Sequence, residues 1–312
     1  MYFGRITGLS SRLPNQIVTN AHFESYLDTS DEWIQKRTGI VKRHWISEGE
    51  TALSLAQSVL EELIQESGQP DAVIVATCSS DKTLPSLAHR LCGIFNLNGL
   101  HFDINSACSG FVVALVQADA LIRSSVVKKV AVIGVDVMSR LIDKHDRSTA
   151  ILFGDGAGGV MLSRGEQAQI KAVHYGSNVE ACGILSDQGD ILAGKSPVIA
   201  MQGQEVFRLA VQAMADSIAV AIEEAGFSPE QVDWFFCHQA NRRILQAVAK
   251  RLRVDESRFY ITLTDQGNTS SASIPLALNH AQANQSLEKG QLVVLSAIGA
   301  GMSWASLILD WR

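Results

Sequence analysis

The sequence lacks the features that mark a secreted, membrane or nucleic-acid-binding protein. Among its 312 residues there is no block of like charge, and the net charge of −6 argues against a general nucleic-acid or membrane-surface binder. No apolar run reaches the length of a membrane span. The first residues also lack the basic-then-apolar arrangement of a signal peptide. We therefore expect a cytoplasmic protein with neither a nucleic-acid nor a membrane partner.

Cysteine is present without the spacings that would give it a structural role. The five cysteines are an odd number, form no CxxC pair and have no metal-ligand spacing. A chain of this length with 46% hydrophobic residues can bury a large core without disulfides, and it has room for about two domain-sized units. These observations predict a reducing compartment and no metal site.

One of these cysteines lies where a nucleophile could be activated. Residues 103–111 form a short apolar approach ending in small residues, and Cys108 is followed by a helix-compatible run over 111–122. The positive end of a helix favours the thiolate, which is the nucleophilic form of cysteine. The alternative is a buried, inert cysteine in a core helix, since free cysteine is among the most buried residue types.

Near the N-terminus, a short helix is predicted over residues 30–38. Thr29 or Ser30 serves as its N-cap and Gly39 ends it. Trp33 and Arg37 lie four residues apart and share one helix face. They could clamp an adenine ring and a phosphate; the alternative is a core tryptophan beside a surface arginine.

Helices then alternate with buried strands. A helix over 51–67 leads into an apolar strand over 71–78, and a further strand is expected over 130–135, followed by a glycine-rich segment over 153–162. The glycines of residues 153–162 suggest a nucleotide loop, but the segment has no P-loop lysine and runs directly into a strand. A tight turn with close backbone packing is therefore the better interpretation.

The second half of the sequence repeats the order of the first. A shift of 162 residues lays residues 61–62 on 223–224, Asp71 on Asp233, and 130–133 on 292–295. One shared offset for three features predicts a duplicated βα unit, with halves at 1–165 and 166–312. Strand ends from both halves would then converge on one site.

Two polar groups follow predicted strands of the second half. His238 follows an apolar strand at 233–237, and Asn268 lies in a turn of small polar residues over 265–275. Each alone is more often structural. Together with Cys108 they supply a nucleophile that could hold an acyl group and donors that could stabilise an oxyanion, as thioester chemistry requires.

At this point the sequence resembles the β-ketoacyl-acyl carrier protein synthase III family of the thiolase superfamily. The resemblance covers almost the whole chain. It is carried by five blocks in the family's order: residues 29–33 (TSDEW) with 37–39 (RTG), 107–110 (ACSG), 153–158 (FGDGAG), 238–241 (HQAN) and 267–270 (GNTS).

The resemblance implies an α/β fold of five layers, αβαβα, with two duplicated halves, and a two-step reaction. An acyl-coenzyme A would acylate Cys108; malonyl-acyl carrier protein would then lose carbon dioxide, and its enolate would attack the acyl group. His238 and Asn268 would stabilise the enolate, while the backbone N–H groups of Cys108 and Ala300 would form a second oxyanion hole. No metal or cofactor is implied, because coenzyme A enters as a thioester substrate.

The resemblance also implies binding residues and a homodimer. In the family, a residue matching Leu84 closes the acyl pocket of the neighbouring subunit. The positions implied for coenzyme A are Trp33, Arg37, Thr38, Arg147, Gln204, Ala240 and Arg243. Those implied for docking the acidic carrier protein are Arg208, Arg243, Lys250 and Arg251.

Some positions depart from the family pattern, at Leu84, Ser148, Gln204, Ile298 and Ala300. They leave the acyl donor undetermined. One alternative is therefore a pathway-specific acyltransferase or condensing enzyme with a different donor or acceptor. Another is a non-catalytic protein that binds acyl carriers, which the presence of Cys108, His238 and Asn268 disfavours.

Overall fold

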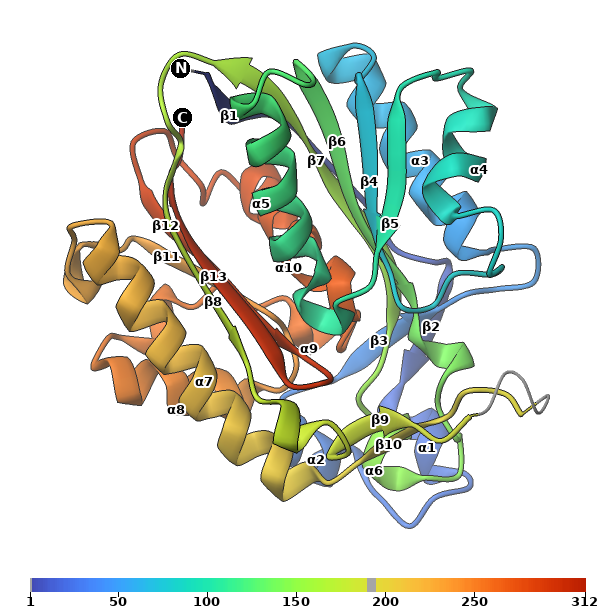
Figure 1. Ribbon diagram of the computed structural model, residues 1–312. Coiled ribbons are helices and arrows are strands. Elements are labelled where there is room, and N and C mark those ends of the chain that lie inside the picture. The colour runs from blue at the N-terminus through green and yellow to red at the C-terminus, as the bar shows by residue number, and fades with distance from the viewer. Residues whose placement is uncertain (1, 190–194) are drawn as a thin grey trace.

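The computed structural model describes residues 2–189 and 195–312. Two β-sheets are separated by a helical layer and covered on their outer faces by further helices, which gives the five layers αβαβα seen in Figure 1. The resemblance predicted this fold class, and it is confirmed.

The first sheet has the order β1-β7-β6-β4-β5 and is built from the first half of the chain. Strands β4, β5 and β6 are mutually parallel, whereas β7 pairs antiparallel with both β6 and β1. β4 is buried along its whole length, as its continuous apolar sequence predicts. The strands are β1 (Phe3–Arg12), β4 (Ala72–Ala76), β5 (Leu100–Ile104), β6 (Lys129–Val137) and β7 (Asp155–Gly165).

The second sheet, of order β11-β12-β13-β8, repeats the arrangement of the first. β11 and β12 are parallel like β4 and β6, and β13 and β8 follow antiparallel like β7 and β1. The strands are β8 (Ile170–Ser177), β11 (Trp234–Cys237), β12 (Leu292–Gly299) and β13 (Ser303–Asp310). The duplicated halves expected from the sequence offset are thus present in the sheets.

Two helices fill the space between the sheets, and two cover each outer face (Figure 1). The middle layer is α5 (Gly110–Arg123) and α10 (Ser273–Ala283). The outer layers are α3 (Ala52–Ser67) with α4 (Leu87–Ile94), and α7 (Gly203–Glu224) with α8 (Arg242–Leu252). Each helix of the middle layer follows a 3₁₀ turn, η1 (Ala107–Ser109) before α5 and η6 (Ser270–Ala272) before α10.

The predicted helix boundaries follow from their caps. In α2 (Asp31–Thr38) the Ser30 side chain accepts a hydrogen bond from the Trp33 N–H, and Gly39 ends the helix at φ 81°. Thr51 caps α3 in the same way, through the Ser54 N–H. Both helices, α2 and α3, begin and end where the sequence predicted.

A single buried cluster of apolar side chains joins the two sheets through the middle layer. It includes Val132 and Leu162 of the first sheet, Phe111 of α5, and Val293 and Leu307 of the second sheet. The position of the middle helices is therefore fixed from both sides, and so is the position of the 3₁₀ turns from which they start.

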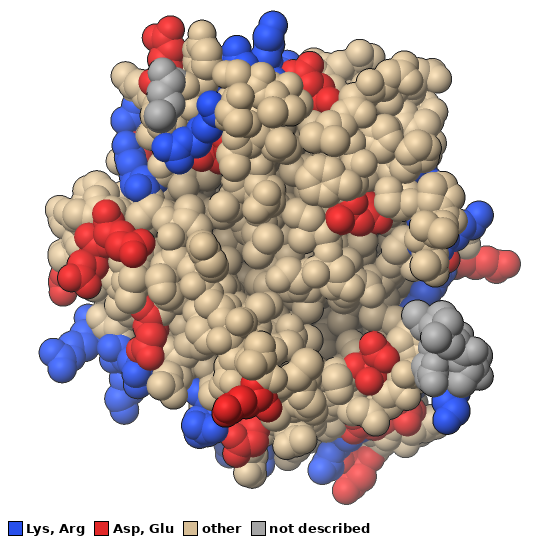
Figure 2. Space-filling model, viewed as in Figure 1, with Lys and Arg blue, Asp and Glu red and all other residues tan. Residues whose placement is uncertain are grey.

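The remaining elements form the edge of the molecule near the carboxyl ends of the parallel strands. No helix in residues 2–189 and 195–312 is long and apolar enough to cross a membrane. In the view of Figure 2, acidic and basic side chains are scattered around the rim and few lie at the centre. The remaining elements at this edge of the molecule are β2 (Gln16–Thr19), β3 (Lys42–Trp45), β9 (Leu185–Asp187), β10 (Ile199–Met201), α1 (Asn20–Glu24), α6 (Arg147–Ala150) and α9 (Leu263–Gln266).

Candidate active site

Cys108, His238 and Asn268 line one cavity of about 110 Å³. Cys108 lies in η1, which follows β5, and His238 directly follows β11. Asn268 comes from the turn between α9 and η6. The three predicted groups are thus brought together from both halves of the chain, although His238 and Asn268 are 130 residues or more from Cys108 in the sequence.

The Cys108 sulfur is partly accessible through the cavity but is otherwise surrounded by protein. Burial raises the pKa of Cys108 to about 11, and hydrogen bonds from the Ser270 hydroxyl and the Cys108 N–H oppose this only in part. Cys108 lies just before α5, which begins at Gly110. Burial therefore opposes the effect of the helix start, which was expected to favour the thiolate.

His238 is almost fully buried, and its Nδ1 lies 2.8 Å from the Ser273 hydroxyl at the start of α10. The Ser273 oxygen also accepts from the Gln239 N–H at 3.4 Å. Burial lowers the pKa of His238 to about 4, opposed in part by a hydrogen bond to the Ser270 backbone, so the ring is neutral. A neutral imidazole carries one N–H group that can donate a hydrogen bond.

Asn268 is fixed to the first half of the chain by its backbone. Its N–H donates to the Leu152 carbonyl at 2.9 Å, and its carbonyl accepts from the Gly154 N–H at 3.0 Å. The side-chain Oδ1 accepts from the Ser270 N–H at 2.9 Å. Because the amide oxygen is engaged in this way, the amide nitrogen is the atom left to donate to a bound group.

The predicted oxyanion donor Ala300 lines a second, larger cavity of about 570 Å³, which also contains Cys108 and Cys78. Just before it, Gly299 packs on the backbone of η1: a Cβ there would lie 2.8 Å from the Cys108 nitrogen and 2.8 Å from the Ser106 oxygen. Only glycine lets the turn between β12 and β13 approach the cysteine this closely.

Four of the residues expected to bind coenzyme A lie close together: Trp33 and three arginines near it. The guanidinium carbon of Arg147 lies 4.7 Å from the centre of the Trp33 ring, and that of Arg37 lies 5.5 Å from it. Trp33, Arg37 and Arg243 line a pocket of about 400 Å³ together with Lys36. Trp33 is half-buried: it packs against a buried apolar cluster and also lines this pocket.

The other three predicted coenzyme A positions are placed differently. Ala240 lines the cavity of Cys108. Gln204 is exposed in the first turn of α7. Thr38 is buried, and its hydroxyl donates to the Ile34 carbonyl at 2.7 Å while it accepts from the Ile40 N–H at 3.0 Å. Both hydrogen bonds of the Thr38 hydroxyl are thus made to the protein's own backbone.

The cationic side chains expected to dock the carrier protein are exposed on α7 and α8. Arg208 pairs with Glu205 at 2.9 Å, and Arg251 pairs with Asp216 at 2.9 Å. Figure 2 accordingly shows acidic side chains beside the basic ones on the side where these helices lie. Leu84, the predicted acyl-pocket residue, is 82% exposed and lies in the loop before α4.

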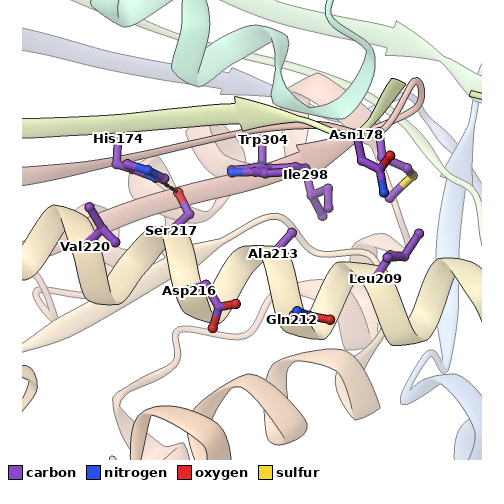
Figure 3. A pocket seen from close by; sticks show the side chains of 11 residues that line it. His174, Asn178, Leu209, Gln212, Ala213, Asp216, Ser217, Val220, Ile298 and Trp304 are labelled. Carbon is purple, nitrogen blue, oxygen red and sulfur yellow. Dashed lines mark hydrogen bonds between the residues drawn. The ribbon is translucent and has the colours of Figure 1, made fainter. Parts of the chain in front are cut away.

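A further pocket of about 230 Å³ lies between α7 and the strands β8 and β13 (Figure 3). It shares Ile298 and Met302 with that cavity but contains none of the three predicted catalytic residues. In this pocket the His174 Nδ1 and the Ser217 hydroxyl form a hydrogen bond of 3.0 Å.

The structure adds residues that the sequence did not single out. Ser273 orients His238, and the fully buried Asp136 of β6 accepts hydrogen bonds from residues on either side of the site. These include Cys78 and Ser271, at 2.9 and 3.0 Å from their backbone nitrogens. The contacts are remote in sequence, so no local motif reveals them.

Comparisons with known proteins agree with this geometry. The family model described as 3-oxoacyl-[acyl-carrier-protein] synthase III matches residues 102–179, and the model of the same family's C-terminal part matches residues 222–311. The chain is 42% identical to the β-ketoacyl-[acyl-carrier-protein] synthase III of Rhodobacter capsulatus, over 98% of both chains.

Solved structures extend the likeness to three dimensions. The 3-oxoacyl-[acyl-carrier-protein] synthase III of Aquifex aeolicus superimposes with a TM-score of 0.93 at 36% identity, covering 99% of this chain and 100% of the other. The priming β-ketosynthase of the R1128 polyketide pathway superimposes with a TM-score of 0.95 at 30% identity, covering 99% and 96%. With this identity along its full length, the chain belongs to the β-ketoacyl-[acyl-carrier-protein] synthase III family.

Proposed function

We propose that this chain catalyses a decarboxylating Claisen condensation between an acyl-coenzyme A and malonyl-acyl carrier protein, through an acyl group held on Cys108. The family is one of acyltransferase-type condensing enzymes of fatty-acid synthesis, which fixes the broad class of reaction. The observation that carries the finer proposal is the single cavity lined by Cys108, His238 and Asn268.

In the first step the Cys108 sulfur attacks the thioester carbonyl of the acyl-coenzyme A. A sulfur–carbon bond forms at Cys108, and the sulfur–carbon bond to coenzyme A breaks. Coenzyme A leaves with the electron pair of the broken bond and takes up the proton that Cys108 gives up, so it departs as the thiol. The carbonyl oxygen carries negative charge in between, so donors must face it. The Cys108 N–H and the turn at Ala300, held close by Gly299, are the groups we assign to it.

In the second step malonyl-acyl carrier protein loses carbon dioxide and leaves an enolate with charge on the thioester oxygen. A neutral His238 with its proton on Nε2 and the Asn268 amide can donate to that oxygen. The enolate carbon then attacks the acyl group, and Cys108 leaves as the thiolate. No metal or electron-sink cofactor takes part in this scheme.

Coenzyme A enters, in this proposal, past Trp33. The adenine would stack between the indole and Arg147, and the phosphates would lie near Arg37 and Arg243, whose pocket has only cationic and aromatic lining residues. The acidic carrier protein would dock on Arg208, Arg243, Lys250 and Arg251, and must compete there with Glu205 and Asp216.

We also propose a homodimer in the cytoplasm. β5 ends the first sheet, and its Leu100 is 41% exposed, so an edge strand is available for pairing with a second copy. Sedimentation at micromolar concentration should give a dimer, and a monomer would contradict this.

Acylation and carbon dioxide release test the proposal together. Native protein and Cys108→Ser are incubated with a panel of acyl-coenzyme A donors, and the mass added at residue 108 is read after digestion. We expect an adduct on the native protein only, since a serine hydroxyl lacks the nucleophilicity of a thiolate. Carbon dioxide release from malonyl-acyl carrier protein then separates condensation from simple acyl transfer. No adduct with any donor would support a non-catalytic, acyl-carrier-binding protein instead.

The alternative of a pathway-specific enzyme depends on the identity of the acyl donor. The likeness at 30% identity to a ketosynthase that primes a polyketide pathway, together with Leu84 in place of the family's aromatic residue, favours testing donors longer than acetyl. A specialised donor preference in the same panel would assign the chain to a specific pathway.

A further inference from the structure

The Ser270 hydroxyl is the side-chain donor that touches the reacting sulfur. Its oxygen lies 3.5 Å from Cys108 Sγ, which is hydrogen-bond distance for sulfur, and Ser270 is fully buried. Both residues lie in the 3₁₀ turn before a helix of the middle layer, Cys108 in η1 and Ser270 in η6. The second half thus presents a hydroxyl to the thiol that the first half presents.

The surrounding structure holds this serine in an unfavourable backbone conformation. Ser270 has φ 52°, a region that residues other than glycine rarely adopt. Its N–H is held by Asn268 Oδ1, and the N–H of the next residue, Ser271, donates to the Asp136 carboxylate at 3.0 Å. A strained residue fixed on both sides next to a nucleophile indicates that the direction of its side chain matters.

The donors and acceptors around Ser270 favour donation of its hydroxyl proton to a sulfur atom. Asp136 can only accept, so the Cys78 thiol, 3.4 Å from Asp136 Oδ1, donates to it. Two sulfur acceptors then compete for the Ser270 proton: Cys108 at 3.5 Å and Cys78 at 4.0 Å. When Cys108 is a thiolate, its negative charge and shorter distance both favour Cys108.

We propose that Ser270 is a further catalytic residue, whose hydroxyl donates a hydrogen bond to the Cys108 thiolate and so stabilises the sulfur as nucleophile and as leaving group. The inference rests on the proposed function for its role in turnover. In acylation the bond is made while sulfur carries the electron pair that forms the new sulfur–carbon bond. In condensation it is made again as that bond breaks and the pair returns to sulfur.

After acylation the thioester sulfur is uncharged and a poor acceptor. The hydroxyl is then free to turn to Cys78, 4.0 Å away. Ser270 therefore distinguishes the thiolate from the acyl-enzyme, and its contribution belongs to the two steps in which sulfur bears charge.

The titratable groups around the sulfur set the direction of the expected pH effect. Asp136 and Cys78 face it from the first sheet, and His238 lines the same cavity from the second. Asp136 raises the pKa of Cys108, as burial does, whereas the Ser270 hydroxyl lowers it. Removal of the hydroxyl must therefore raise the pKa of Cys108 further and lower the thiolate fraction at any pH below it.

Alkylation by iodoacetamide measures that fraction without any acyl substrate. The rate at Cys108 is followed by mass spectrometry of its peptide between about pH 7 and 9, where it is proportional to the thiolate present. Ser270→Ala and Ser270→Gly should both react about tenfold more slowly than the native protein, the size expected for one hydrogen bond to a charged group.

Two features of the design exclude a merely structural cause. Glycine suits φ 52° and alanine does not, so a rate that falls in Ser270→Ala but not in Ser270→Gly would reflect backbone strain and overturn the proposal. The matched control is Ser217→Ala, which removes another buried hydroxyl but lies in the separate pocket of Figure 3 and should alkylate at the native rate. Native rates in both Ser270 variants would also overturn the proposal.

A second measurement separates this inference from the proposed function. Acylation by acyl-coenzyme A should fall with the alkylation rate in both Ser270 variants, while decarboxylation of malonyl-acyl carrier protein without an acyl donor, which needs no thiolate, should stay within about twofold of native. If the native protein takes up no acyl group from any donor but the alkylation difference persists, the proposed function fails and the hydrogen bond to the thiolate stands.

Discussion

At the scale of single residues, burial decides the charge of the two central groups. It raises the pKa of Cys108 to about 11 and lowers that of His238 to about 4, so both are neutral in the resting site near pH 7. A neutral pair avoids an isolated charge in a buried cavity before the substrate arrives. The charges of the reaction are then formed on substrate atoms and on sulfur, beside donors that are already in place.

The division of labour between the two steps predicts unequal effects of substitution. In His238→Ala and Asn268→Ala, acylation of Cys108 should largely survive, while decarboxylation should fall about a hundredfold or more, the size expected for loss of one oxyanion donor. Single-turnover acylation and carbon dioxide release are measured separately. An equal loss of both steps in His238→Ala would show that His238 also removes the Cys108 proton.

The depressed pKa of His238 also predicts a pH-dependent stability. Between its ordinary value of 6.5 and about 4, the unfolded chain protonates this histidine while the folded protein does not. The contribution of the neutral His238 to the free energy of unfolding is therefore complete above pH 6.5. It is lost as the pH falls toward 4, by at most about 1.4 kcal/mol per pH unit. Urea unfolding of native protein and His238→Gln should converge in free energy as the pH is lowered. A constant difference would contradict the assigned pKa.

At the scale of elements, the caps and the apolar pattern were enough to predict most of the framework. Ser30 and Gly39 bound α2 as expected, and the apolar run at residues 71–78 is the buried strand β4. The glycine-rich segment at residues 153–162 is not a phosphate loop: most of it is strand β7, whose Gly158 and Gly159 pack closely against neighbouring backbone.

The candidate site could be predicted only in part, for a physical reason. Cys108, His238 and Asn268 follow elements whose ends carry local sequence signals. The hydrogen bonds of Ser270, Ser273 and Asp136 depend on how β6, η6 and α10 meet, which no local pattern encodes. The burial that raises the pKa of Cys108 could not be predicted for the same reason, since its depth is a property of the assembled layers.

The contact between the β12–β13 turn and η1 predicts the effect of one methyl group. In Gly299→Ala the Cβ would meet the Cys108 nitrogen and Ser106 oxygen at 2.8 Å, so the two elements must separate, at a cost of about 1–3 kcal/mol. We expect acylation of Cys108 to fall at least about tenfold as the oxyanion donors move apart.

The matched control for this variant is Gly93→Ala in α4. A Cβ there meets nothing within 4 Å, and alanine favours a helix, so neither stability nor acylation should fall. Equal acylation in Gly299→Ala and the native protein would remove the turn from the oxyanion hole.

At the scale of the whole molecule, the proposed dimer gives the exposed Leu84 a partner surface. In the proposed dimer it closes the partner's acyl pocket, and leucine leaves more room there than phenylalanine. Each methylene buried in that room contributes roughly 0.8 kcal/mol. We therefore expect kcat/KM for octanoyl-coenzyme A at least comparable with that for acetyl-coenzyme A, and a shift toward acetyl in Leu84→Phe.

An exposed apolar residue elsewhere provides the control for Leu84. Ile17 of β2 is 55% exposed and lines neither cavity of Cys108, so Ile17→Phe should leave the octanoyl-to-acetyl ratio unchanged. A strong acetyl preference in the native protein that Leu84→Phe does not alter would show that Leu84 does not set the depth of the pocket.

The apolar cluster that joins both sheets through α5 and α10 makes the two halves thermodynamically inseparable. Val132 and Leu162 share this cluster with Val293 and Leu307, so melting either half would expose apolar surface of the other. Calorimetry should accordingly give one endotherm, with equal calorimetric and van't Hoff enthalpies per cooperative unit. Two resolved endotherms would mean that a chain built by duplication has kept two independent folding units; a single one would mean that its halves gave up separate stability to share one site.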